Sequence, residues 1–198
     1  MLLDYFVRGG VVMWPILAAS VVALGVILDR LVWFARGRGD PRALRREALR
    51  LVEAGAHDQA LAGCAASPHP VAAVLEAGLS AWGEPQEEVE RRLEQAATDQ
   101  LEQAETRLPL LATMIAVLPM LGFLGTIVGL IHAFAAWSSG GAQVTIELLA
   151  AGLSEAMITT AAGLATSIPY VVAYNALTSR VALLARALQA RGINLRLG

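Results

Sequence analysis

The stretches LPMLGFLGTIVGLIHAF (118–134) and GLSEAMITTAAGLATSIPYVVAYN (152–175) decide the fold of this chain. Both are strongly apolar, and both carry small and hydroxylated residues that recur with the period of an α-helix. A short polar loop joins them, and no arginine occurs between residues 108 and 174. The two stretches predict a pair of neighbouring membrane-spanning helices, and the rest of the chain is expected to hold, orient or couple that pair.

The composition indicates a membrane protein. Of the 198 residues, 56% are hydrophobic and 16% are charged, which is too apolar for an ordinary soluble domain of this length. All 15 basic residues are arginine. Cys64 is the single cysteine, which excludes an internal disulfide and a multi-cysteine zinc site. The sequence has no nucleotide-binding loop, catalytic triad, metal-ligand set or basic nucleic-acid patch, so we expect no enzyme activity, no cofactor and no nucleic-acid partner.

Residues 11–34 predict a first membrane span ahead of the helix pair. At about 1.5 Å per residue, the uninterrupted apolar part from Val11 to Leu28 covers roughly 27 Å, close to the hydrocarbon thickness of a bilayer. Trp14 and Trp33 bracket it, as aromatic residues do at the two membrane interfaces. A cleaved signal peptide is the alternative, but the apolar run is longer than a usual signal core, and the arginines come after it.

The arginines set the predicted orientation. Seven follow the apolar part of the first span, between residues 30 and 50, four follow the third span between residues 180 and 196, and Arg8 alone lies on the other side. The positive-inside rule then places the amino terminus outside and the carboxyl terminus in the cytoplasm. The predicted parts are an external leader (1–10), transmembrane helix one (11–34), a cytoplasmic helical domain (35–108), transmembrane helix two (109–137), an external loop (138–151), transmembrane helix three (152–177) and a cytoplasmic carboxyl-terminal helix (178–198).

The cytoplasmic domain is predicted to be helical. Asp40 and Pro41 form an N-cap and first-turn proline, and helices are expected over 41–53, 57–65 and 71–82. A longer helix starts after Pro85, with acid–arginine pairs four residues apart at Glu87/Arg91 and Glu88/Arg92. Its acidic residues predict a solvated or inter-subunit face. No loop signal separates this helix from the second span, so it is expected to continue into the membrane with an adjustment at Pro109.

Small residues form a stripe on each helix of the pair. The stripe of the second span is Gly122, Thr126, Gly129 and Ala133, and that of the third is Ala156, Thr160, Gly163 and Ser167. Small residues let helix backbones approach closely, and Gly125 with Gly129 fits the known packing pattern, so Gly122, Gly125, Gly129 and Gly163 are predicted packing residues. The two stripes could line a path between the helices. The alternative is that they serve helix packing alone, with their hydroxyls bonded to carbonyls of their own helix.

Thr126, Thr160 and Glu155 are the candidate functional residues. Counted inward from the external ends of their helices, both threonines lie roughly 12–16 Å below the outer interface, at a depth where they would form one polar layer. Glu155 lies about one turn nearer the outside, and a carboxylate in a span is a functional candidate by default. The alternative for Glu155 is an interfacial residue near Ser154 at the start of the helix.

The prolines, tyrosines and histidine of the second and third spans are interpreted as structural residues. Pro119 and Pro169 each remove a helical hydrogen bond and are expected to kink their helices. Tyr170 and Tyr174 are assigned to an internal aromatic belt and packing rather than to a pore lining. His132 is interpreted as a packed residue rather than a proton relay.

The two quoted stretches, together with GGVVMWPILAASVVALGVILDRL (9–31), resemble the MotA/TolQ/ExbB proton channel family, and in particular its three-span ExbB/TolQ branch. The resemblance covers nearly the whole chain and is weakest over residues 40–100. The motif of the third span is the most distinctive. MotA itself is less similar, because it brings four spans and a larger cytoplasmic part.

The resemblance implies a homopentameric ring in the bacterial inner membrane that surrounds the helices of an ExbD/TolR-like single-span partner. Proton-motive force would then move that partner, which drives outer-membrane or envelope work through a TonB- or TolA-like protein. The proton-carrying aspartate belongs to the partner in this family, and the second and third spans contain no aspartate. By motif position, Thr126 and Thr160 match the threonines that face this aspartate, and Glu155 matches the glutamate near the entrance of the third helix.

A non-conducting scaffold that assembles membrane partners is the alternative function. It would explain the small-residue stripes and the cytoplasmic helices equally well. Substitution of Glu155 discriminates between a channel subunit and a scaffold, because a scaffold should tolerate the loss of this residue. The sequence leaves open whether the driven process is siderophore uptake, envelope maintenance, gliding or another task.

Overall fold

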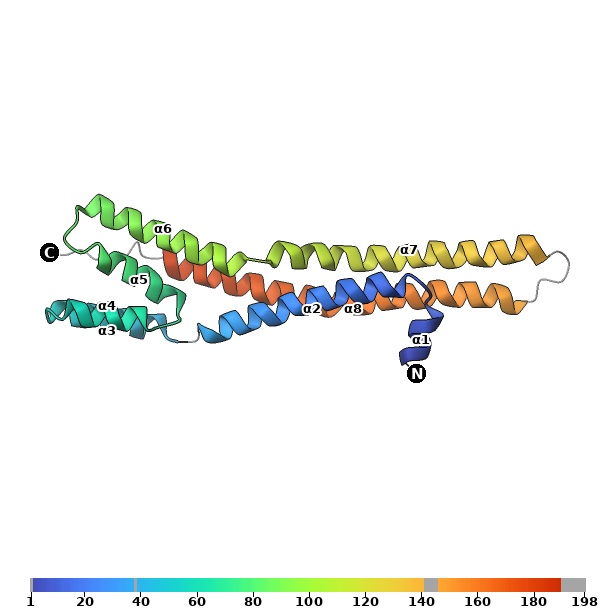
Figure 1. The fold of residues 1–198 in the computed structure, drawn as a ribbon, viewed down its shortest axis with the longest axis horizontal. Helices are drawn as coiled ribbons and strands as arrows, with labels where there is room; N and C mark the ends of the chain where they lie inside the picture. The colour runs from blue at the N-terminus through green and yellow to red at the C-terminus, as the bar shows by residue number, and fades with distance from the viewer. Residues whose placement is uncertain (1, 38, 141–145, 190–198) are drawn as a thin grey trace. The chain divides into compact units, whose positions relative to one another are not determined.

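The computed structural model describes residues 2–37, 39–140 and 146–189, and all regular structure within them is α-helical (Figure 1). The helices are α1 (Leu2–Arg8), α2 (Met13–Arg36), α3 (Pro41–Glu53), α4 (His57–Ala65), α5 (Pro70–Ser80), α6 (Gln86–Glu105), α7 (Leu108–Gly140) and α8 (Ile146–Gln189). Three of them, α2, α7 and α8, contain stretches long and apolar enough to cross a membrane. The predicted all-α class with three candidate spans is confirmed.

The chain divides into two compact units. The first, here the apolar unit, comprises Met1–Leu28 and Arg107–Asn175. The second, here the polar unit, comprises Asp29–Thr106 and Ala176–Gly198. Helices α2 and α8 each contribute residues to both units.

In the apolar unit, the start of α2 packs against α7 and α8. The buried core is formed by Val12, Met13, Ile16, Ala19 and Leu118. The Tyr170 hydroxyl of α8 donates to the Ser20 carbonyl oxygen at 3.1 Å and lies 2.7 Å from the Ser20 hydroxyl. Hydrogen bonds of this kind hold helices together where no water competes for the donor. Tyr170 therefore joins α2 to α8.

The helices of the predicted pair are longer than the sequence indicated. Helix α7 continues to Gly140 and α8 begins at Ile146, so residues assigned to the external loop are helical on both sides of 141–145, which lie outside the described residues. Both helices run unbroken past Pro119 and Pro169. The predicted third span and carboxyl-terminal helix form one helix as far as Gln189. The predicted leader contains the short helix α1.

The polar unit begins with the predicted cap. The Asp40 side chain accepts from the Arg42 N–H at 2.9 Å, and Pro41 occupies the first turn of α3. Helix α3 ends at Glu53, before Gly55, whose φ of 75° suits glycine. Helices α3, α4 and α5 bury one core, formed by Ala48, Ala60, Cys64, Leu75 and Leu79. The cap and the bounds of α3 and α4 confirm the expectations from the sequence.

The predicted continuity of α6 into the second span is wrong. Helix α6 ends at Glu105, Arg107 adopts a positive φ of 68°, and α7 starts at Leu108. Pro109 supplies the reason, because its ring would clash with the carbonyl of the residue four positions earlier in a continuous helix. As the second residue of α7, it needs no helical hydrogen-bond donor.

Of the two charge pairs predicted on α6, Glu88 with Arg92 is confirmed and Glu87 with Arg91 is not. Arg91 and Arg92 both bind Glu88, with N–O distances of 2.6 and 2.9 Å, so Arg91 pairs at i,i+3 rather than with Glu87. Their hydrogen bonds, that of Arg91 first, lower the pKa of Glu88 to about 2. These groups are on the surface, where solvent screens such pairs, and their contribution to stability is small.

Arg30 ties α2 to α6 within the polar unit. It is 6% exposed, and its Nη1 donates to the carbonyl oxygen of Gln103 at 2.7 Å. Its Nε and Nη2 both donate to Asp29 Oδ2. A buried guanidinium is tolerated where several acceptors satisfy it. Arg30 thus fixes the end of α6 beside the second half of α2.

Cys64 is expected to be an unreactive thiol in the folded protein. It is 2% exposed, and burial, with a smaller effect of Glu76, raises its pKa. Since the thiolate is the reactive form, maleimide labelling near neutral pH should be several times slower in the native state than in denaturant. In a Cys64→Ser background, Ser80→Cys on the exposed end of α5 provides the fast-reacting control. Equal native rates at the two positions would contradict this prediction.

Candidate functional site

The contact between α7 and α8 is made by glycines. At Gly122, an added Cβ would lie 3.1 Å from the Thr159 carbonyl oxygen and 3.3 Å from the Thr160 Cα. At Gly129, it would lie 2.7 Å from the Gly152 carbonyl oxygen. A real Cβ essentially never approaches another atom as closely as it would at Gly129, so a larger residue there would force the helices to shift. At Gly122 the contact would be tight, and the neighbouring backbone would have to move by a few tenths of an ångström.

Two further glycines extend the same contact. An added Cβ at Gly163 would lie 2.7 Å from the Leu118 carbonyl oxygen and 3.0 Å from the Gly122 Cα. One at Gly125 would overlap the Thr159 side chain. The four glycines that the sequence proposed for packing therefore all face the partner helix in the apolar unit.

Thr159 fills the centre of this contact, a position that the sequence did not single out. Its side chain is fully buried, and its hydroxyl donates to the carbonyl oxygens of Ala156 at 2.9 Å and Glu155 at 3.1 Å. Both acceptors belong to its own helix, so the hydroxyl is satisfied without any group from α7. Its proximity to Gly125 shows that it packs rather than lines a path.

Thr160 bonds across the helix pair. Its hydroxyl donates to the Gly122 carbonyl oxygen of α7 at 3.2 Å, and its side chain is half-buried. The Thr126 hydroxyl donates to the Phe123 carbonyl oxygen of its own helix at 2.5 Å, and Thr126 is also half-buried. In an α-helix, the Gly122 carbonyl also accepts from the Thr126 backbone N–H. The Thr160 hydroxyl therefore bonds across to the turn of α7 that precedes Thr126, whereas the Thr126 hydroxyl bonds within its own helix.

Glu155 is held from two sides. Its Oε2 lies 3.1 Å from His132 Nδ1 of α7. An added Cβ on Gly10, which has a φ of 67°, would overlap Glu155 Oε1, so the turn between α1 and α2 packs against the carboxylate. The Glu155 side chain is 16% exposed and that of His132 is 58% exposed. An ionisable pair within a span is the kind of feature that marks a functional site.

The sequence interpretation of His132 was a packed residue, but the structure pairs its side chain with Glu155. The pair joins positions 23 residues apart, one on each helix, so no local spacing links them. The only signal in the sequence was that both ionisable residues lie near the external ends of adjacent predicted spans.

The outward faces of α7 and α8 are apolar. Exposed side chains of α7 include Phe123, Ile127, Ile131 and Phe134, and those of α8 include Met157, Leu164, Ile168 and Val172. Exposed apolar surface of this extent requires lipid or other transmembrane helices as neighbours. Within the described residues, no group of three or more histidine, cysteine, aspartate or glutamate side chains has metal-site geometry.

The fold and this contact define an all-α protein with three candidate membrane spans, two of which pair through glycines in the apolar unit. The sequence model of the MotA/TolQ/ExbB proton channel family matches residues 66–190, which is more than half of the chain. The chain belongs to the MotA/TolQ/ExbB family, as its motifs predicted.

Individual relatives agree with this assignment. The ExbB-like 1 putative biopolymer transport protein of Synechocystis sp. is 33% identical over 183 residues, covering 90% of this chain and 71% of that protein. The Tol-Pal system protein TolQ of Haemophilus influenzae is 45% identical over 91 residues, or 46% of this chain and 40% of that protein. The biopolymer transport protein ExbB of Xanthomonas campestris is 38% identical over 87 residues, covering 44% of this chain and 34% of that protein. The chain thus matches less than half the length of the last two relatives.

Proposed function

We propose that this chain is an ExbB/TolQ-like subunit of an inner-membrane proton channel. Several copies, five by analogy with the family, would surround the transmembrane helices of an ExbD/TolR-like partner. Proton-motive force would move that partner and so energise outer-membrane transport or envelope work through a TonB- or TolA-like protein. The observation that carries this proposal is the Thr160 hydroxyl bond across to Gly122 of α7, one turn or more inside the Glu155–His132 pair, and with Thr126 it would form one polar layer.

The polar layer suits a proton-carrying carboxylate on another chain. Such a group must be neutral in a dry region, and it needs hydrogen-bonding partners that add no charge. Hydroxyls meet both conditions, since each can rotate from a backbone carbonyl to a visiting carboxyl group. Thr126 and Thr160 are half-buried rather than enclosed, which leaves their edge of the pair open to a partner helix.

Glu155 and His132 suit the external entrance of the path. Carboxyl and imidazole groups are chemically able to carry a proton, and both side chains lie toward the external ends of their helices in the predicted orientation, with the amino terminus outside and the carboxyl terminus in the cytoplasm. One elementary charge crossing 100 mV releases about 2.3 kcal/mol, which is enough to bias a conformational step. Several charges are needed for larger work on the envelope.

Proton flux into liposomes tests the proposed function. The chain is reconstituted alone and then with the ExbD/TolR-like protein from the same source. Flux that requires both proteins is the expected result. A stable complex of the two that conducts no protons under an imposed potential would sink the proposal.

Thr160→Val is expected to reduce this flux by about tenfold or more, because it keeps the side-chain shape while removing a donor that stabilises the transferring group. Thr166→Val is the matched control, since the Thr166 hydroxyl donates only to its own helix, at Ala162 and Gly163 among the described contacts. Complex formation should be unchanged in both variants. Unchanged flux in an assembled Thr160→Val complex would rule out the polar-layer role.

A non-conducting scaffold is the second candidate. The observation that favours it is the bonding of the candidate hydroxyls, since those of Thr126 and Thr160 already have backbone acceptors in the chain by itself. A scaffold of this kind would hold membrane partners through the exposed apolar faces of α7 and α8. It predicts a stable complex whose envelope function survives loss of Glu155.

A further inference from the structure

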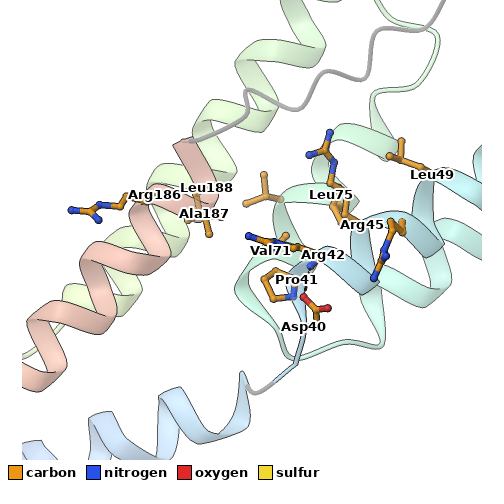
Figure 2. A pocket seen from close by; sticks show the side chains of 12 residues that line it. Asp40, Pro41, Arg42, Arg45, Leu49, Val71, Leu75, Arg186, Ala187 and Leu188 are labelled. Carbon is orange, nitrogen blue, oxygen red and sulfur yellow. Dashed lines mark hydrogen bonds between the residues drawn. The ribbon is translucent and has the colours of Figure 1, made fainter.

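The polar unit contains an arginine-lined groove that the proposed proton path does not use. It has a volume of about 810 Å³ and lies among α3, the first part of α5 and the end of α8 (Figure 2). Its charged lining residues are Arg42, Arg45, Arg46, Arg186 and Asp40, so four arginines face one acid. Its apolar lining residues are Leu49, Val71, Val74, Leu75, Ala187 and Leu188. The groove is here called the arginine groove.

Within the part of the chain that the structure describes, the single acid that lines the arginine groove does not balance its four arginines. The Asp40 carboxylate is engaged in capping α3 through the Arg42 N–H. Arg45 Nε is buried and has no hydrogen-bond acceptor among the residues that the structure describes. The guanidinium groups that line the groove outnumber its one acid, and a carboxylate is the best partner for a guanidinium. The chemistry of the groove therefore fits an acidic occupant that also brings apolar surface.

The chain itself carries such a surface on α6. Five exposed glutamates share one broad face of this helix at spacings of three, four, eight and three residues: Glu87, Glu90, Glu94, Glu102 and Glu105. Arg91 also lies on this face and binds Glu88, so the face keeps a net negative charge. Half-buried Leu101 lies on the same face. The buried residues of α6, Leu93 and Ala104, point elsewhere, into the unit. No residue of α6 lines the arginine groove in its own chain.

We propose that the arginine groove of one copy binds the acidic face of α6 of the neighbouring copy. The groove and the acidic face are different surfaces, so each copy offers one of each. The contact is therefore of the head-to-tail type, which forms a ring where the rotation between copies closes. The proposal rests on the homo-oligomer within the proposed function, but it does not depend on proton conduction. A free anion or lipid headgroup would use the arginines and leave the apolar lining uncovered, which favours a helix as the occupant.

The arginine groove and the acidic face of α6 lie at about the same height along the axis of α6. Ala77 and Ser80 of α5 lie beside Gln95 of α6, where they line a small cavity together. The groove residues Val74 and Leu75 precede them by about one turn, so the groove lies level with the middle of α6. Rotation about a ring axis keeps each residue at its own height. Glu94, in the middle of α6, is therefore the first partner expected for Arg45 of the next copy.

Cross-linking between two differently tagged copies tests this interface in native membranes. In a Cys64→Ser background, one copy carries Arg45→Cys and the other Glu94→Cys. Paired arginine and glutamate backbones lie further apart than a disulfide spans, so a short bismaleimide is used. Asp99→Cys is the control, because it is exposed on α6 but lies about 140° around the helix from Glu94. We expect a product that contains both tags, several times more abundant with Glu94→Cys than with Asp99→Cys.

Three results would overturn the interface. They are equal yields at the two α6 positions, an intact oligomer that gives no product, and a cross-link within single chains that carry both substitutions. Charge reversal provides a second measurement. Arg45→Glu or Glu94→Arg alone should reduce co-purification of the two tagged copies severalfold, and the two reversals together should restore it. A cross-linked ring without proton flux would refute the proposed channel and leave this interface standing.

Discussion

Glu155→Gln is expected to reduce partner-dependent proton flux on the order of 100-fold, the scale on which a positioned acid–base group contributes to proton transfer. The substitution keeps the size of the side chain, so the contact with the turn at Gly10 remains. It removes the ionisable group while leaving an amide that still bonds His132. Assembly with the ExbD/TolR-like partner should therefore be retained. Flux into liposomes, normalised to the amount of complex, is the measurement.

His132→Gln completes this test. If the pair acts as a relay, His132→Gln lowers flux as Glu155→Gln does, and the double variant is little worse than either single one, because both remove the same step. If His132 only supports the carboxylate, its loss alone has a much smaller effect. Wild-type flux in an assembled Glu155→Gln complex would contradict the role of Glu155 and favour the scaffold.

Much of the fold follows from patterns that are local in the sequence. The apolar runs, the cap at Asp40 and the glycine before α4 each depend on neighbouring residues, and they gave the class and several helix bounds correctly. The break at Arg107 was missed because Pro109 was weighed as an adjustment within a helix rather than as the start of a new one. A proline is compatible with both, and local sequence does not separate them.

The site was less accessible to sequence reasoning. Helical spacing placed Thr126 and Thr160 on small-residue stripes, but it could not show that Thr160 bonds across to the Gly122 carbonyl. Pairing of Glu155 with His132, and the packing of Gly10 on the same carboxylate, depend on how three helices meet. Such contacts are set by tertiary packing, which periodicity in one helix does not contain.

Gly163→Leu is expected to cause the largest loss of stability of any single change in the helix pair. Its added Cβ would meet the Leu118 carbonyl oxygen and the Gly122 Cα, and neither backbone atom can move without displacing α7. Overpacking of a tight core costs about 1–3 kcal/mol, and forcing two helices apart also breaks the Thr160 hydrogen bond to Gly122. Midpoints of thermal unfolding in detergent measure the loss.

Gly25→Leu is the matched control for this prediction. Gly25 is an exposed glycine in the apolar part of α2, and nothing lies within 4 Å of an added Cβ there. The same substitution therefore adds the same apolar volume without a clash, and removing a helical glycine favours the helix by up to about 1 kcal/mol. An unfolding midpoint well below wild type for Gly163→Leu, with Gly25→Leu at or above it, is expected. Equal midpoints for the two variants would mean that the glycine contact does not set the separation of α7 and α8.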